Sequence, residues 1–330
     1  MRTIALNCSR RAFFRLAGAA GALPLSMRFT LAQAYPSRPV RIIVGFAPGG
    51  ATDVAARLIS QSLSERLSQP FVVENRPGAG GNLASEAVIR SAPDGHTLLA
   101  AGVNDAVNAT LFTKLTYNFI RDTTPVAGIM TAPNLMVVHP SVPARTVPEF
   151  ISYARSNPGR LNMASAGTGS GPHMAGELFK IMAAIDITHV PYRGGSAAIP
   201  DLLAGRVQLM FTVPSLTIDH IKANNLRALG VTTLKRWVGF PTLPPVSESL
   251  PGYEATNWFG IAAPMNTPAE VVKTLNREIN ACLVEPNIEA KLAALGADAL
   301  VSSPAEFGKL IADETEKWGR VVHSANIKAG

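Results

Sequence analysis

Short runs of apolar and β-branched residues alternate along the chain with longer stretches in which apolar positions recur at helical spacing. The runs are short enough to be buried strands, and the longer stretches have the period of amphipathic helices. Strands that alternate with helices in this way are typical of parallel sheets covered by helices, so the pattern predicts an α/β fold. The predicted strands span residues 40–46, 71–74, 97–101, 135–139, 187–191, 207–212 and 226–231.

Several helices have recognisable starts. Thr52 and Asp53 stand in front of apolar positions at helical spacing, and Thr146 with Glu149 has the spacing of a capping box. Pro268 occupies the favoured first position of a further helix, and a last helix is expected over residues 303 to about 324.

The N-terminal segment has the features of a signal peptide. Arginines 2, 10, 11 and 15 precede an apolar stretch at 16–25, and Ala32-Gln33-Ala34 matches a signal peptidase site. We therefore expect cleavage after about Ala34 and a periplasmic location. The apolar stretch is too short to span a membrane. Residues 9–15 also match the twin-arginine export pattern.

Removal of this segment changes what the composition implies. It holds five of the thirty basic residues and no acidic residue, so the net charge falls from +7 to about +2. A near-neutral chain with scattered lysines and arginines has no basic patch that would attract nucleic acid or a membrane surface. About 296 residues remain of the 330, more than one hydrophobic core comfortably holds, so we expect two lobes. Cys282 is then the one remaining cysteine. The histidines have no metal-ligand spacing, and we predict neither a metal nor a cofactor.

Two glycine-rich loops between a predicted strand and a predicted helix are the main candidate binding sites. Glycine lets a ligand approach the backbone, and a helix N-terminus offers unpaired N–H groups and a partial positive charge to an anion. Either loop could instead be purely structural. The candidate ligand-binding residues are Phe46, Pro48, Gly49, Gly50, Thr52 and Asp53 in the first loop, and Ser165, Gly167, Thr168, Gly169, Ser170 and His173 in the second.

Three further candidates, Asn104, Tyr192 and Arg193, follow predicted strands, and a fourth, Thr212, is the last residue of the predicted strand 207–212. Ligands bind open α/β sheets at the carboxyl ends of strands. Arg193 could pair with a ligand carboxylate or form an ordinary ion pair. For Asp53 the alternative is helix capping, and for His173 it is a satisfied buried histidine.

The loops do not match known catalytic or nucleotide-binding motifs. Neither ends in the Gly-Lys-Ser/Thr of a P-loop, and the glycines at 167–171 are wrongly spaced for a dinucleotide fingerprint. Thr168 and Pro172 stand where a nucleophile elbow around Ser170 needs glycine. We therefore predict that the protein is not an enzyme.

Motifs over most of the chain resemble the exported substrate-binding proteins of tripartite tricarboxylate transporters, known as Bug proteins. The matching segments are residues 35–41, 44–53, 73–82, 92–98, 190–195 and 201–205. The resemblance implies a two-lobed periplasmic binding protein of Venus-flytrap, type II-like form, with a mostly parallel sheet flanked by helices in each lobe. It also implies that residues 35–131 plus 265–330 form the first lobe and residues 132–264 the second.

In this family a ligand carboxylate is held between the lobes by loops that correspond here to residues 46–53 and 165–173, partly through water. The lobes close around the ligand, which then passes to the membrane subunits of the transporter. The resemblance implies a monomer that binds a small organic carboxylate. The lack of an arginine cluster favours a mono- or dicarboxylate over citrate. A sensory binding protein is the alternative function, and an exported hydrolase is a more distant one.

Overall fold

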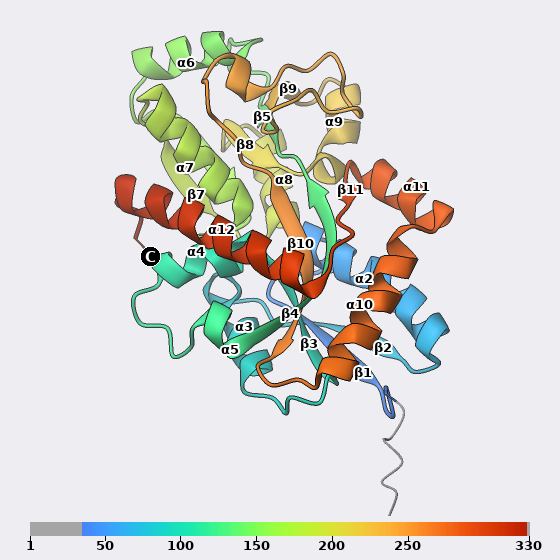
Figure 1. Ribbon diagram of the computed structural model, residues 1–330. Helices are drawn as coiled ribbons and strands as arrows, with labels where there is room; N and C mark the ends of the chain where they lie inside the picture. Colours follow the sequence, from blue (N-terminus) through green and yellow to red (C-terminus); the bar gives the residue numbers. More distant parts are fainter. Residues whose placement is uncertain (1–34, 329–330) are drawn as a thin grey trace, which may run out of the picture. The chain divides into compact units, whose positions relative to one another are not determined.

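The computed structural model describes residues 35–328, which form two β-sheets flanked by helices (Figure 1). The predicted signal peptide lies outside the described residues. The first sheet has the strand order β11-β4-β10-β3-β1-β2, and we call it and its helices the first lobe. Its strands are β1 (Val40–Val44), β2 (Phe71–Asn75), β3 (Thr97–Gly102), β4 (Thr123–Ala132), β10 (Asn257–Pro264) and β11 (Asp298–Ala299).

The second sheet has the order β7-β6-β8-β5-β9, and with its helices it forms the second lobe. Its strands are β5 (Leu135–Val138), β6 (Asn162–Ser165), β7 (Thr188–Pro191), β8 (Leu209–Thr212) and β9 (Arg227–Val231). The predicted two-lobed α/β fold is thus confirmed.

The helices connect the strands and cover the sheets (Figure 1). The longer ones are α2 (Ala51–Leu67), α3 (Asn82–Ile89), α4 (Val103–Leu111), α6 (Val147–Ser156), α7 (Gly171–Ala183), α8 (Gly195–Leu203), α10 (Ala269–Leu283), α11 (Pro286–Leu295) and α12 (Pro304–Ser324). The short ones are α5 (Phe119–Asp122), α9 (Ile218–Lys222), and the 3₁₀ turns η1 (Ala79–Gly81), η2 (Pro214–Leu216) and η3 (Val246–Glu248).

Both sheets are mixed, which corrects the prediction of mostly parallel sheets. Strand β1 pairs in parallel with β2 and β3, whereas β10 is antiparallel to β3 and β4. In the second sheet β6 is parallel to β7 and β8, but β5 is antiparallel to β8 and β9. The antiparallel pairs involve β4, β5 and β10, the strands next to the points where the chain passes from one sheet to the other.

Strand β10 also changes the expected lobe boundary. We expected residues up to 264 in the second lobe, but β10 is wholly buried and lies between β3 and β4 of the first sheet. The chain therefore returns to the first sheet before Asn257. The buried Trp258 packs edge to face on Phe307 of α12, with ring centroids 5.6 Å apart. This contact ties the C-terminal helix to the first lobe, where α12 also packs on α4 and β4.

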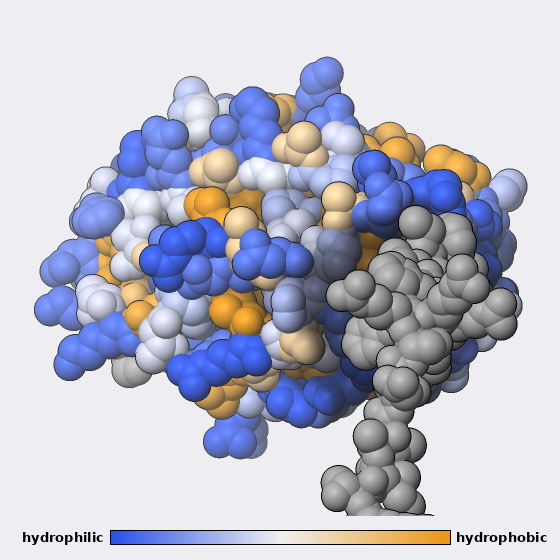
Figure 2. Space-filling model, turned by 60° about the horizontal axis from the view of Figure 1, so that its bottom comes forward, coloured by the Kyte–Doolittle hydropathy of each residue, from blue (hydrophilic) through white to orange (hydrophobic). Residues whose placement is uncertain are grey.

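On the face shown in Figure 2, hydrophobic residues form small patches among hydrophilic ones. Within residues 35–328 no helix has both the length and the apolar character that crossing a membrane requires.

Candidate functional site

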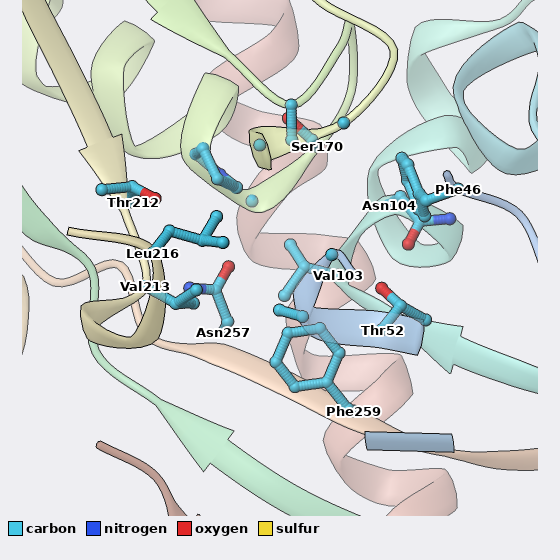
Figure 3. A pocket seen from close by; sticks show the side chains of 17 residues that line it. Phe46, Thr52, Val103, Asn104, Ser170, Thr212, Val213, Leu216, Asn257 and Phe259 are labelled. Carbon is cyan, nitrogen blue, oxygen red and sulfur yellow. The ribbon is translucent and has the colours of Figure 1, made fainter. Parts of the chain in front are cut away.

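A cavity of about 60 Å³ lies where loops of the first lobe meet loops of the second (Figure 3). One water molecule needs roughly 10–15 Å³ of such space, so the cavity has room for roughly four to six water-sized groups. It is lined by Phe46, Gly50, Ala51, Thr52, Val103, Asn104, Phe259 and Asn257 from the first lobe, and by Ala166, Ser170, Gly171, Pro172, Gly194, Gly195, Thr212, Val213 and Leu216 from the second.

Four helices begin at this cavity. The first residues of α2, α4, α7 and α8 all line it, two helices from each lobe. The N-caps of α2 and α8 are Gly50 and Gly194, which provide no side-chain cap. The first N–H groups of these two helices are therefore available to a ligand, and every helix adds the positive end of its dipole.

The side chains on the cavity wall carry no formal charge. None of its lining residues is Asp, Glu, Lys, Arg or His. The electrostatic potential in the cavity therefore comes mainly from backbone N–H groups and helix dipoles, which favour an anion. Apolar side chains, among them Phe46, Val103, Leu216 and Phe259, also line the cavity (Figure 3).

The first predicted loop contributes only part of its residues to the wall. Phe46, Gly50 and Thr52 line the cavity, but Pro48, Gly49 and Asp53 do not. The carboxylate of Asp53 is buried and accepts hydrogen bonds from Gly49 N at 2.9 Å, Arg57 Nε at 2.9 Å and Asn75 Nδ2 at 2.8 Å. Burial alone would raise the pKa of Asp53, but these hydrogen bonds hold it below its usual value. Asp53 fixes the shape of the loop.

The second predicted loop is supported by a pair of histidines. His173 does not line the cavity; it is buried, and its Nδ1 accepts a hydrogen bond from Gly169 N at 3.1 Å. Its ring stacks on that of His189, with centroids 3.9 Å apart. His189 Nε2 lies 2.6 Å from Ser165 Oγ. Burial lowers the pKa of His189 to about 4 and that of His173 well below its usual value, so both rings are neutral at pH 7.

Within this loop Ser170 lines the cavity. Its hydroxyl donates to Gly167 O at 2.7 Å and accepts from His173 N, which caps α7. Asn104 and Thr212 also line the cavity, as their places after β3 and at the end of β8 suggested.

Tyr192 and Arg193 line a second, outer cavity of about 610 Å³ together with Gly167 and Thr168. The two cavities share Phe46 and Ala166 in their walls. The Tyr192 hydroxyl donates to Asp201 Oδ2 at 2.7 Å. Arg193 is the charged side chain among the residues that line this outer cavity.

Sequence reasoning missed several lining residues. Gly194 and Gly195 start α8, and the same strand–glycine–helix pattern that marked the two loops could have marked them. Asn257 carried no signal, because its role depends on the position of β10. Across residues 35–328, no three His, Cys, Asp or Glu side chains are grouped so as to hold a metal ion.

Two helix-flanked sheets with an uncharged cavity between their loops define a two-lobed binding protein. Comparison with known proteins gives the family. Residues 55–327 match the family described as "Tripartite tricarboxylate transporter family receptor", and the chain belongs to this family. The predicted resemblance is confirmed.

The relatives include Bug proteins, as expected. Protein BugT of Bordetella pertussis is 35% identical over 300 residues, which cover 90% of this chain and 92% of BugT. The structure of R. palustris Rpa4515 with adipate has a TM-score of 0.86 at 37% identity, covering 89% of this chain and 99% of that one. MatC from Rhodopseudomonas palustris with bound malate has a TM-score of 0.83 at 33% identity, covering 87% and 100%.

Proposed function

We propose that this protein is a periplasmic solute-binding protein that captures a small carboxylate in the inner cavity and delivers it to the membrane subunits of a tripartite tricarboxylate transporter. The observation that carries the proposal is the meeting of four helix N-termini at a cavity with no charged side chain. Such a site suits an anion and disfavours a cation, because the positive ends of helix dipoles face the ligand and no acidic side chain lines the cavity.

The available donors are strong enough for this role. A hydrogen bond to a charged group contributes roughly 1.5–3 kcal/mol, and a favourably placed helix terminus up to about 2 kcal/mol. Micromolar binding needs about 8 kcal/mol after association costs. Four to six backbone or hydroxyl donors suffice, roughly the number that the first N–H groups of α2 and α8 and the hydroxyl of Thr52 can present.

The family and its solved members support the same ligand class. Adipate and malate, found in two similar structures, are both carboxylates. A receptor family binds its ligand without converting it, so we propose no enzymatic activity and no cofactor. The protein acts as a monomer, and residues 1–34 are removed on export through the twin-arginine route.

Ligand capture works through the two lobes. We place the first lobe at residues 35–132 and 257–328 and the second at residues 133–256. Because each lobe supplies two helix N-termini, a carboxylate gains its full set of donors only when both lobes contact it. Binding therefore favours the closed arrangement of the lobes over an open one.

Isothermal titration of the exported, purified protein tests the proposal. The panel contains mono-, di- and tricarboxylates, each with its neutral amide as a matched control. We expect micromolar binding of at least one acid and at least tenfold weaker binding of its amide. If no acid binds, or if the amide binds as well as the acid, the proposal is wrong.

A further inference from the structure

One buried side-chain oxygen of the cavity wall has no hydrogen-bond partner among the described residues. Thr212, at the end of β8, is 1% exposed, and its Oγ1 is buried with no hydrogen-bond partner among residues 35–328. Its side chain lies at the cavity wall beside Val213 and Leu216 (Figure 3). A buried hydroxyl without a hydrogen bond is unfavourable, so a partner is expected to enter from the cavity.

The other polar side chains of the second-lobe wall and of β10 are already engaged. Ser170 Oγ donates to Gly167 O, and Asn257 Nδ2 donates to Asn134 Oδ1 at 2.8 Å. These bonds hold both groups in place whether or not the cavity is filled. Thr212 differs because its side chain is positioned by the strand while its hydroxyl remains free to rotate toward a ligand.

The surroundings of Thr212 limit the chemistry of its partner. No charged side chain lines the cavity, so a second ionised group beside Thr212 would have no counter-charge. The apolar neighbours Val213 and Leu216 suit a hydrocarbon segment (Figure 3). A hydroxyl or oxo group on a short carbon chain meets both conditions, because it forms a hydrogen bond without carrying a charge.

We propose that Thr212 determines ligand specificity by hydrogen-bonding to a hydroxyl or oxo substituent, so that the protein prefers a hydroxy- or oxo-carboxylate over the unsubstituted acid. This inference rests on the proposed carboxylate-binding function and adds the substituent. A site built to hydrogen-bond a ligand group discriminates against the analogue that lacks it, because its own polar group is then left unpaired.

The test compares acids in pairs that differ by one oxygen-bearing group, such as butyrate with 3-hydroxybutyrate and with 3-oxobutyrate, and succinate with malate. Isothermal titration gives the dissociation constants for wild type, Thr212→Val, Thr212→Ser and Thr217→Val. Valine has nearly the shape of threonine but no hydroxyl. Thr217 is a matched control, because it is 0% exposed, its Oγ1 has no partner among the described residues, and it does not line the cavity.

Wild type should bind the substituted member of at least one pair about tenfold or more tightly, the effect of roughly one neutral hydrogen bond. Thr212→Val should lose this preference, whereas Thr212→Ser and Thr217→Val should keep it. Should Thr212→Val fail to fold in circular dichroism, Thr212→Ala takes its place.

The outcomes separate the two proposals. If acids bind but wild type shows no preference within any pair, only the specificity proposal is wrong. It is also wrong if Thr212→Val weakens both members of a pair equally, since Thr212 would then hold a water molecule or the carboxylate itself. If no acid of either kind binds, the proposed function is wrong and this inference falls with it.

Discussion

Replacing Gly169 with alanine should weaken ligand binding, because the new methyl group would collide with the opposite lobe. Gly169 has φ +81°, and a Cβ at this position would lie 2.5 Å from Asn108 Oδ1 and 3.1 Å from Leu111 Cδ2. Asn108 belongs to α4 of the first lobe and cannot easily move, since its Nδ2 donates to Gly80 O at 3.0 Å and to Asn82 Oδ1 at 2.8 Å.

Two costs arise, and they affect different measurements. The left-handed backbone costs alanine roughly 1–2 kcal/mol in either arrangement of the lobes, which lowers the stability of the fold. The collision with Asn108 arises only when the lobes are together. To avoid the methyl group, Asn108 would have to break one or two of its hydrogen bonds, at about 0.5–1.5 kcal/mol each. Tolerating the overlap would have a similar cost, so binding should lose about 1–3 kcal/mol. The dissociation constant should therefore rise about five- to 150-fold.

The assay is isothermal titration with the acid that binds wild type most tightly, together with thermal unfolding. Gly252→Ala is the matched control, because Gly252 has φ +87° and a Cβ added there would meet nothing within 4 Å. Both variants should unfold at a lower temperature, but only Gly169→Ala should bind more weakly. A dissociation constant for Gly169→Ala within about twofold of the control would refute the reasoning, because a shift of several-fold is the smallest that a collision of about 1 kcal/mol produces.

Three further predictions concern other parts of the chain. The free energy of unfolding, measured with urea, should decrease by up to about 3 kcal/mol between pH 6.5 and pH 4. The reason is that folding lowers the pKa of His189 from its usual value to about 4, so that the unfolded chain binds a proton at a higher pH than the folded one does. Replacing His189 with asparagine should reduce the slope of this pH dependence without abolishing it, because the pKa of the buried His173 is lowered on folding as well. An unchanged slope would contradict the assignment. Asp53→Asn should lower the free energy of unfolding by about 1–2 kcal/mol, because the ionic hydrogen bond from the half-exposed Arg57 is lost. Equal stability of the variant and wild type would show that the loop does not depend on this hydrogen bond. Replacing Arg10 and Arg11 with lysine should stop export, as measured by cell fractionation. Continued secretion would show that the twin-arginine route is wrong while leaving the predicted location unaffected.

The sequence predicted those features of the site that depend on local chemistry. Glycine followed by a helix start marked the loops around Gly50 and Ser170, and both residues line the cavity. The role of His173 was harder to predict, because a histidine near a glycine-rich loop can either face a ligand or support the loop. Its stacking on His189, sixteen residues further on, favours support of the loop and depends on the pairing of β6 with β7.

Features that depend on contacts between distant segments were not predictable in the same way. Strand β10 begins and ends with residues that gave no strand signal, and only its pairing with β3 and β4 assigns Asn257 to the cavity. The unpaired hydroxyl of Thr212 is equally invisible in the sequence, since most threonines in strands find a partner. Whether one is left without a hydrogen bond depends on the packing of every neighbouring side chain.

The uncharged wall of the inner cavity has a consequence for the conditions in which the protein can work. Dissolved ions weaken the attraction between charges that face water, with a screening length of about 10 Å at 0.1 M salt. Backbone N–H groups enclosed in a cavity of about 60 Å³ are out of reach of that ionic atmosphere once the ligand fills the space. Their hold on an anion should therefore change little between dilute and saline surroundings, which suits a receptor whose compartment exchanges salts with the medium outside the cell.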